Sequence, residues 1–291
     1  MNETIATALR QPDGLVALSD GGVALVEADA AGGALTVVDA HGARREICRI
    51  DGHPTGLAVD GAGCFWVAGG PQNSVLRISP EGKVLKTITG TKEQPFVLPK
   101  NLAFGPAGLL YMSDCGVRLS DLIDGADIRP DFYEASYNGR IYQIDPQAGR
   151  VLRTLATGLL MANGIAFDAE GLLYYSETLT GTIYRQVVGG RPQAFAHVSR
   201  SQTTGGLRGP AGLAFNRGGM LYCAKYGEGD ICLIDPAGKV AGHIPTNGRL
   251  PDDIAFTQDG KYALIAEHEH GALEKIPVPS PGGLPLHTPL L

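Results

Sequence analysis

Polar side chains recur at two fixed positions of a phrase that the sequence repeats six times. The first position is held in turn by Asp13, Thr55, Lys100, Asn163, Ala211 and Asp252. The second position comes 14 residues later in five copies and 15 in the last, and is held by Glu27, Gly69, Asp114, Glu177, Lys225 and Glu267. Six carboxylates brought together must be protonated, paired or bound to a metal ion. These two positions therefore supply the candidate functional residues, provided that the fold gathers them.

Three interpretations of these residues stay open at this point. A divalent cation such as Ca²⁺ prefers oxygen ligands, which Asp13, Asn163 and Asp252 supply. Lys100 and Lys225 could instead neutralise part of the charge without a metal. The residues of the second position could also do no more than cap the ends of strands and solvate a rim.

The repeated phrase has the pattern of a β-hairpin, because an apolar run, a turn containing Asp or Gly and a second apolar run follow one another. Its copies read PDGLVALSDGGVALVE from Pro12, PTGLAVDGAGCFWVAG from Pro54, PKNLAFGPAGLLYMSD from Pro99, ANGIAFDAEGLLYYSE from Ala162, PAGLAFNRGGMLYCAK from Pro210 and PDDIAFTQDGKYALIAE from Pro251. Runs this apolar predict strands with both faces buried between neighbouring sheets.

Further strands are expected after the hairpins. Third strands are expected at 74–79, 139–146, 181–187 and 230–236, and fourth strands at 83–89 and 150–156. Four antiparallel strands per copy, at a spacing of about 40 to 50 residues, predict an all-β six-bladed β-propeller in which residues 1–291 form a single domain. The last copy lacks a fourth strand, and the segment 3–9 could supply it and close the ring.

This architecture would bring both polar positions to one end of the central channel. The innermost strand of each blade starts at that mouth, and the second strand returns to it. The insertion at 116–139 follows Asp114, so we expect it near the same mouth, and it is too polar for the core. Within it, Arg118 is a candidate for contact with a substrate.

Composition narrows the classes of partner. The net charge is −6 and no cluster of Lys or Arg occurs, which argues against a nucleic-acid partner. No apolar run is long enough to span a membrane, and no signal peptide is evident at the start. The five cysteines are odd in number and form no CxxC pair, which favours reduced thiols and a cytoplasmic protein. A small-molecule substrate is the expected partner, and the sequence does not set the oligomeric state.

The third and fourth copies carry a family resemblance. LPKNLAFGPAGLLYMSD and NGIAFDAEGLLYYSETLTGTIYR resemble the SMP-30/gluconolactonase/LRE-like family and, more distantly, strictosidine-synthase-like propellers. The resemblance covers nearly the whole chain. It implies a six-bladed propeller that holds one divalent cation, often Ca²⁺, at the channel mouth and that hydrolyses lactones.

The ligand positions that the resemblance implies are only partly kept. Asn163 matches the Asn of blade four, and Asp13 replaces the Glu of blade one. Lys100 stands in place of the Asn of blade three, with Asn101 beside it. Ala211 stands in place of the Asp of blade five, a ligand and proton acceptor, and Asp252 of blade six is the candidate to compensate for its loss.

Three functions follow as expectations. The first is hydrolysis of a lactone or related ester, in which a cation on Asp13, Asn163 and Asp252 polarises the carbonyl and Asp252 or Glu267 activates water. The second is a metal-free, strictosidine-synthase-like enzyme that uses Lys100 as an electrophile or as a Schiff-base nucleophile on a carbonyl substrate. The third is a non-enzymatic, NHL-like binding propeller. The expected substrate contacts are Asn101, Asp114, Glu177, Lys225, His268 and Arg118.

Overall fold

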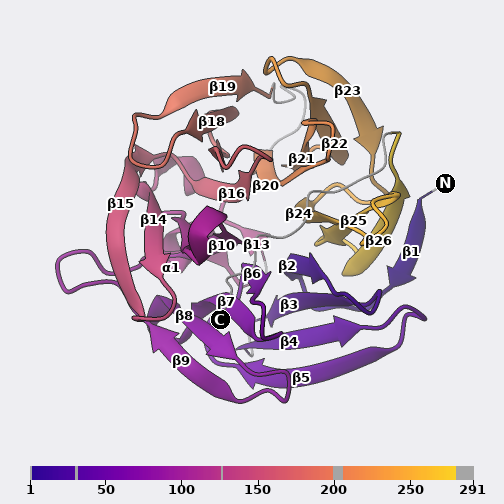
Figure 1. The fold of residues 1–291 in the computed structure, drawn as a ribbon, viewed down its shortest axis with the longest axis horizontal. Coiled ribbons are helices and arrows are strands. Elements are labelled where there is room, and N and C mark those ends of the chain that lie inside the picture. The colour runs from indigo at the N-terminus through magenta and orange to yellow at the C-terminus, as the bar shows by residue number, and fades with distance from the viewer. Residues whose placement is uncertain (1, 30–31, 126, 199–205, 280–291) are drawn as a thin grey trace.

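The computed structural model describes residues 2–29, 32–125, 127–198 and 206–279, and within them six four-stranded sheets stand around a central axis (Figure 1). Every sheet is antiparallel, and its strands run in order from the axis outward. The six-bladed propeller predicted from the repeat is therefore confirmed. No helix in the described residues is both long enough and apolar enough to cross a membrane.

Each blade is named here from its innermost strand outward. The first three blades are β2 (Pro12–Ala17), β3 (Val23–Asp29), β4 (Gly32–Val38) and β5 (Arg44–Ile50); β6 (Leu57–Val59), β7 (Phe65–Gly70), β8 (Ser74–Ile78) and β9 (Val84–Ile88); and β10 (Pro99–Phe104), β11 (Leu110–Asp114), β14 (Gly139–Asp145) and β15 (Arg150–Leu159). The next two are β16 (Ala162–Phe167), β17 (Leu173–Glu177), β18 (Thr182–Gln186) and β19 (Gln193–His197); and β20 (Gly209–Phe215), β21 (Leu221–Tyr226), β22 (Asp230–Ile234) and β23 (Val240–Pro245). The sixth contains β24 (Pro251–Phe256), β25 (Tyr262–Glu267), β26 (Ala272–Pro277) and β1 (Glu3–Ala6). Short 3₁₀ turns occur at Pro71–Asn73, Pro106–Gly108 and Phe132–Glu134.

The ring is closed by strands from the two ends of the sequence. Strand β1 pairs antiparallel with β26, with Glu3 opposite Lys275 and Thr4 opposite Glu274, and the two lie side by side in Figure 1. This pairing covers the edge that β26 would otherwise present to solvent. The expected contribution of segment 3–9 to the last blade is thus confirmed over Glu3–Ala6.

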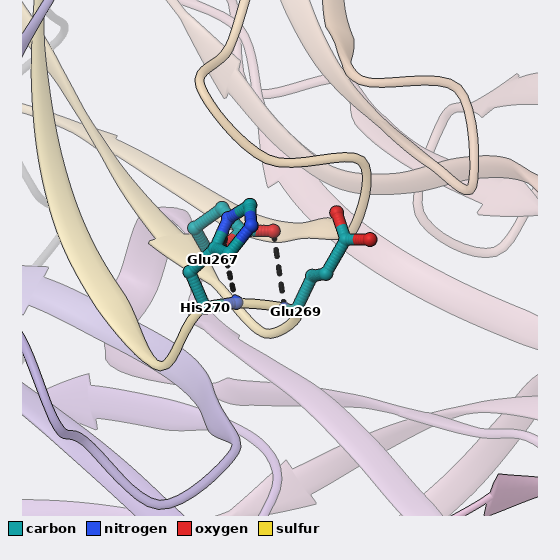
Figure 2. A group of neighbouring side chains, drawn as sticks. All are labelled: Glu267, Glu269 and His270. Carbon is teal, nitrogen blue, oxygen red and sulfur yellow. Dashed lines mark hydrogen bonds and ion pairs between the residues drawn. The ribbon is translucent and has the colours of Figure 1, made fainter.

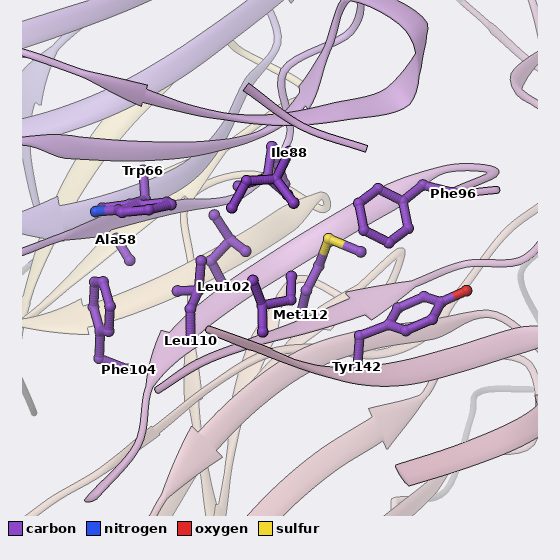
Figure 3. Packing of buried hydrophobic residues seen from close by; sticks show 12 residues of the cluster. Ala58, Trp66, Ile88, Phe96, Leu102, Phe104, Leu110, Met112 and Tyr142 are labelled. Atoms are coloured by element: carbon purple, nitrogen blue, oxygen red, sulfur yellow. The ribbon is translucent and has the colours of Figure 1, made fainter. Parts of the chain in front are cut away.

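Apolar side chains fill the space between neighbouring blades. Figure 3 shows the cluster between blades two and three, where Trp66 of β7 packs edge-on against Phe104 of β10 with ring centroids 6.0 Å apart. Met112 and Tyr142 extend the same layer outward. Both faces of each inner strand are buried in this way, which is why the hairpin sequences read as nearly continuous apolar runs.

Glycine lets the innermost strands converge on the axis. A Cβ atom at Gly14 would lie 2.5 Å from the carbonyl oxygen of Thr55 in the next blade, and one at Gly56 would lie 2.4 Å from that of Lys100. These glycines directly follow residues of the first polar position. A side chain larger than glycine at either position would force neighbouring strands apart. The glycines therefore allow the residues of the first polar position to lie close to one another.

The insertion at 116–139 forms a small lid between β11 and β14. It contains α1 (Leu119–Leu122) and a two-stranded ribbon of β12 (Ile123–Asp124) and β13 (Asp127–Ile128). The expectation that this segment is too polar for the core is wrong for one face, because Leu122 is buried and Ile123, Ile128 and Phe132 pack against the same apolar cluster. Its exposed polar residues include Arg118, Asp124 and Asp127.

Candidate active site at one end of the channel

The innermost strands begin around a cavity of about 710 Å³. Five of the six residues at the first polar position line it: Asp13, Thr55, Lys100, Asn163 and Asp252. A smaller cavity of about 240 Å³ lies where the same strands end, and it is lined mainly by aliphatic and phenylalanine side chains. The polar end of the channel is therefore the one that sequence reasoning selected.

The five residues of the first position that line this cavity are called the ring below. Lys100 joins the two carboxylates among them. Its Nζ donates to Asp13 Oδ2 at 2.5 Å and lies 3.0 Å from Asp252 Oδ1. All three residues are less than 10% exposed. Burial alone would lower the pKa of Lys100, but Asp13 and Asp252 outweigh it and raise the pKa above its ordinary value. Lys100 is therefore an ammonium ion at neutral pH.

Asp13 has the complementary electrostatics. Burial, followed by the charge of Asp252, raises its pKa well above the ordinary value, and the neighbouring Lys100 only partly opposes this. Two buried carboxylates facing one ammonium leave the group one negative charge in excess. The ring therefore takes up a proton on a carboxylate more readily than an exposed aspartate would.

Asn163 contributes a carbonyl oxygen to the same cavity. Its Nδ2 donates to Thr178 Oγ1 at 3.1 Å, and Thr178 in turn donates to the carbonyl oxygen of Pro210 at 2.8 Å. The Oδ1 atom of Asn163 is buried and accepts no hydrogen bond from the described residues. An unsatisfied acceptor of this kind can take a hydrogen bond from water or from a substrate hydroxyl.

Two neutral imidazoles line the cavity. Burial, with the nearby charges of Lys100 and His268, lowers the pKa of His53 to about 4. Burial also lowers the pKa of His268, with Lys100 acting in the same direction against Asp252 and Glu267. The Nδ1 atom of His268 is buried with no hydrogen-bond partner among the described residues. Both rings are unprotonated at neutral pH and can act as bases.

His53 and Tyr226 are cavity residues that the repeat did not single out. His53 lies in the loop before β6, and Tyr226 ends β21. His53 precedes the ring residue Thr55 by two positions, so proximity to the ring position was the available signal. Cys115 also lines the cavity, where burial raises the pKa of its thiol and keeps it protonated.

The carboxylates of the second position bind backbone N–H groups and do not line the cavity. Each accepts a hydrogen bond from a backbone N–H 17 residues earlier, which holds the chain segment that leads into the innermost strand. The pairs are Glu27 with Arg10 at 2.7 Å, Asp114 with Val97 at 2.8 Å, Glu177 with Leu160 at 2.6 Å and Glu267 with Leu250 at 3.1 Å. None of these four carboxylates lines the cavity.

The remaining expected substrate contacts also lie away from the cavity. Lys225 is 3.4 Å from Asp230 Oδ1 within blade five. Asn101 donates to Asp253 Oδ1 at 3.2 Å across the channel and lines the smaller cavity instead. Arg118 is exposed at the start of the lid. Of the six residues expected to contact substrate, His268 is the one that lines the larger cavity.

A metal ion can be tested against two groups of residues. Glu267, Glu269 and His270 place potential ligand atoms within 4.8 Å of one another (Figure 2), the spacing that a divalent ion could use. However, Glu267 already accepts hydrogen bonds from the backbone N–H groups of Glu269 and His270 at 3.1 and 2.8 Å. At the ring, the Lys100 ammonium bridges Asp13 and Asp252, and Ala211 offers no ligand. The ring as arranged therefore fits an ammonium and not a divalent cation.

Comparison with known proteins finds similarity to lactonases and to related propellers. A 72-residue stretch is 44% identical to a 6-deoxy-6-sulfogluconolactonase of Pseudomonas putida, and this match spans 24% of the chain and 23% of that relative. Two solved structures share the fold over nearly the full chain. A gluconolactonase from Xanthomonas campestris has a TM-score of 0.76 at 21% identity, covering 96% of this chain and 89% of its own. Regucalcin, a calcium-binding protein from Agrobacterium tumefaciens, has a TM-score of 0.77 at 16% identity, covering 100% and 97%.

The family model extends over the second half of the ring. It matches residues 124–266 and so includes Asn163 and Asp252, whereas Asp13 and Lys100 lie outside the matched region. Residues 124–266 are thus an SMP-30/gluconolactonase/LRE-like region, which confirms the family resemblance that the hairpin copies indicate.

Proposed function

We propose that this protein hydrolyses lactones in the 710 Å³ cavity, with Lys100 as the electrophile. The observation that carries the proposal is the buried ammonium of Lys100, fixed 2.5 Å from Asp13 and 3.0 Å from Asp252 at one end of the cavity. The lactonase names of its relatives supply the reaction class. The substrate is then a small molecule that enters beside the lid.

Lys100 would act on the lactone carbonyl. An ammonium has three N–H donors, of which two are directed to the paired aspartates and one remains for a ligand. A donor held in a buried site stabilises the negative charge that develops on the carbonyl oxygen in the transition state. Because Asp13 and Asp252 fix the Nζ atom in advance, little reorganisation is needed during the reaction.

A neutral base would then activate water. We assign this role to His268, because its imidazole is unprotonated and its buried Nδ1 has no partner among the described residues. Water adds to the carbonyl carbon as His268 takes its proton. The ring C–O bond then breaks, the leaving oxygen recovers that proton, and the product is a hydroxy acid. Asp252 is the second candidate for the base, whereas Glu267 is engaged with backbone donors outside the cavity.

Calcium, which the family resemblance implies, has no step in this mechanism. A cation at the ring would require the ammonium of Lys100 to leave its two partners. The Schiff-base alternative is also disfavoured, because the raised pKa of Lys100 keeps the amine protonated and non-nucleophilic.

The decisive experiment measures lactone hydrolysis by the purified protein and its Lys100→Met variant. We expect kcat/KM to fall about 100- to 1,000-fold, the typical effect of removing one oxyanion donor. Lys225→Met is the matched control, since Lys225 is equally buried but lies outside the cavity, and it should retain activity. Full activity in Lys100→Met, or no lactone hydrolysis by the native protein, would refute the proposal.

A further inference from the structure

Resting on this proposed function, we propose that the preferred substrates are neutral lactones with an apolar substituent, and not polyhydroxylated or anionic sugar lactones. The first observation is the wall that faces the ring. It is built by Leu119, Leu122, Ile123 and Ile128 of the lid, with Met161 and Leu250 from the surrounding loops. The lining of the cavity therefore combines the polar ring with an apolar wall, and further charged side chains such as Asp127 and Glu269 lie on it as well.

The apolar wall is a packed part of the structure. Leu122 and Met161 belong to one buried cluster with Leu98, Leu207 and Tyr226, and Ile123 and Ile128 pack against it. Ile123 and Ile128 are also direct cross-strand partners in the β12–β13 ribbon, so their side chains share one face. This packing holds an apolar surface toward the cavity.

Binding of a sugar lactone against this apolar wall is unfavourable. Each of its hydroxyl groups would lose hydrogen bonds to water and find few polar partners on the lid side. An alkyl substituent instead gains roughly a factor of four in binding for each methylene group buried. The wall thus selects for apolar substituents on the ring of the lactone.

The charges around the cavity act against anionic substituents. Among the residues that the structure describes, two cationic side chains and five acidic ones line the cavity: Arg10 and Lys100, against Asp13, Asp29, Asp127, Asp252 and Glu269. Both cations are already engaged, because Arg10 is 3.3 Å from Asp29 and 3.4 Å from Glu46, and Lys100 pairs with the ring. A sulfonate or carboxylate on the substrate would therefore meet an excess of negative charge.

The test compares δ-nonalactone, unsubstituted δ-valerolactone and glucono-1,5-lactone as substrates of the native protein. We expect kcat/KM for δ-nonalactone to exceed that for δ-valerolactone at least tenfold, with gluconolactone the poorest of the three. Equal or faster hydrolysis of gluconolactone would overturn this inference and leave lactone hydrolysis intact. Hydrolysis of none of the three would instead reject the proposed function.

A lid variant gives a second, independent readout. The double substitution Ile123→Thr with Ile128→Thr keeps the branch at Cβ, shortens each side chain by one methyl group and adds two hydroxyl groups to the wall. We expect KM for δ-nonalactone to rise at least fivefold, with δ-valerolactone changed less than twofold. Asp124→Asn, an exposed change in the same ribbon that does not line the cavity, is the control. Equal losses on both substrates, with an unaltered melting temperature, would contradict the assignment of the wall.

Discussion

Removal of the Lys100 ammonium should reveal how strongly the ring depends on it. In Lys100→Met, Asp13 and Asp252 lose their common cation while both side chains stay 10% exposed or less. Breaking a buried ion pair by deleting one partner costs about 3–5 kcal/mol. We therefore expect the free energy of unfolding at pH 7.5 to fall by about that amount, a large part of a typical domain's stability.

The loss should depend on pH in a definite direction. Without Lys100, nothing opposes the burial that already raises the pKa of Asp13, so the folded variant binds a proton that the unfolded chain releases above about pH 4. A carboxylate with a raised folded pKa stabilises the native state as pH falls, because the folded state then holds more protons. Lys100→Met should therefore recover part of its deficit between pH 7.5 and pH 5.

Urea denaturation at both pH values measures this effect. Lys225→Met is the matched control, because its nearer partner, Asp230 at 3.4 Å, is 22% exposed and can be solvated when the cation is lost, while Glu228 is farther away at 3.9 Å. The control should lose less stability and show a smaller pH dependence. A deficit below about 1 kcal/mol for Lys100→Met at pH 7.5, or the same deficit at both pH values, would refute the electrostatic account of the ring.

The other predictions concern catalysis, capping and metal. His268→Gln should lower kcat/KM about 100-fold. Because the pKa of His268 is lowered, native activity should persist below pH 6.5 and then fall as the imidazole protonates, and a pH profile checks both points. Glu177→Gln should cost about 1–2 kcal/mol in urea denaturation and leave kcat/KM unchanged, because Glu177 holds the Leu160 N–H and the Tyr184 hydroxyl outside the cavity. Dialysis against a chelator should leave kcat/KM within twofold of the untreated protein, whereas a loss restored by Ca²⁺ would assign the metal a catalytic role.

The repeat was enough to predict both the blades and the ring. Once six hairpins are placed around an axis, the residue before each innermost strand must face the same end of the channel. The repeat therefore predicts that Asp13, Lys100, Asn163 and Asp252 lie close together, although they are up to 239 residues apart in the sequence. All four line the same cavity in the structure. This prediction needed no knowledge of side-chain conformations, because the backbone alone fixes where these residues lie.

The sequence pattern does not distinguish carboxylates that line the cavity from carboxylates that bind backbone N–H groups. Glu177 and Glu267 are as polar as Asp252 and stand at the same end of a blade, but both accept hydrogen bonds from backbone N–H groups, which every residue except proline carries. Sequence pattern does not reveal which carboxylate will turn to the backbone. The repeat also did not predict His53 as a cavity residue, because His53 lies in a connecting loop outside the repeated hairpin.

The departures from the family pattern at Lys100 and Ala211 make sense together as a matter of charge. The resemblance implies a divalent cation held by two carboxylates and amides, a group with no net charge. Here one ammonium faces Asp13 and Asp252, and the readiness of Asp13 to take a proton brings this group close to neutrality as well. A third carboxylate at position 211 would add one more negative charge to this buried group, which a low-dielectric site tolerates poorly. A neutral residue such as Ala211 therefore suits a group whose cation is the ammonium of Lys100. The replacement of Asp by Ala removes a metal ligand, and it also removes the negative charge that the metal would have balanced.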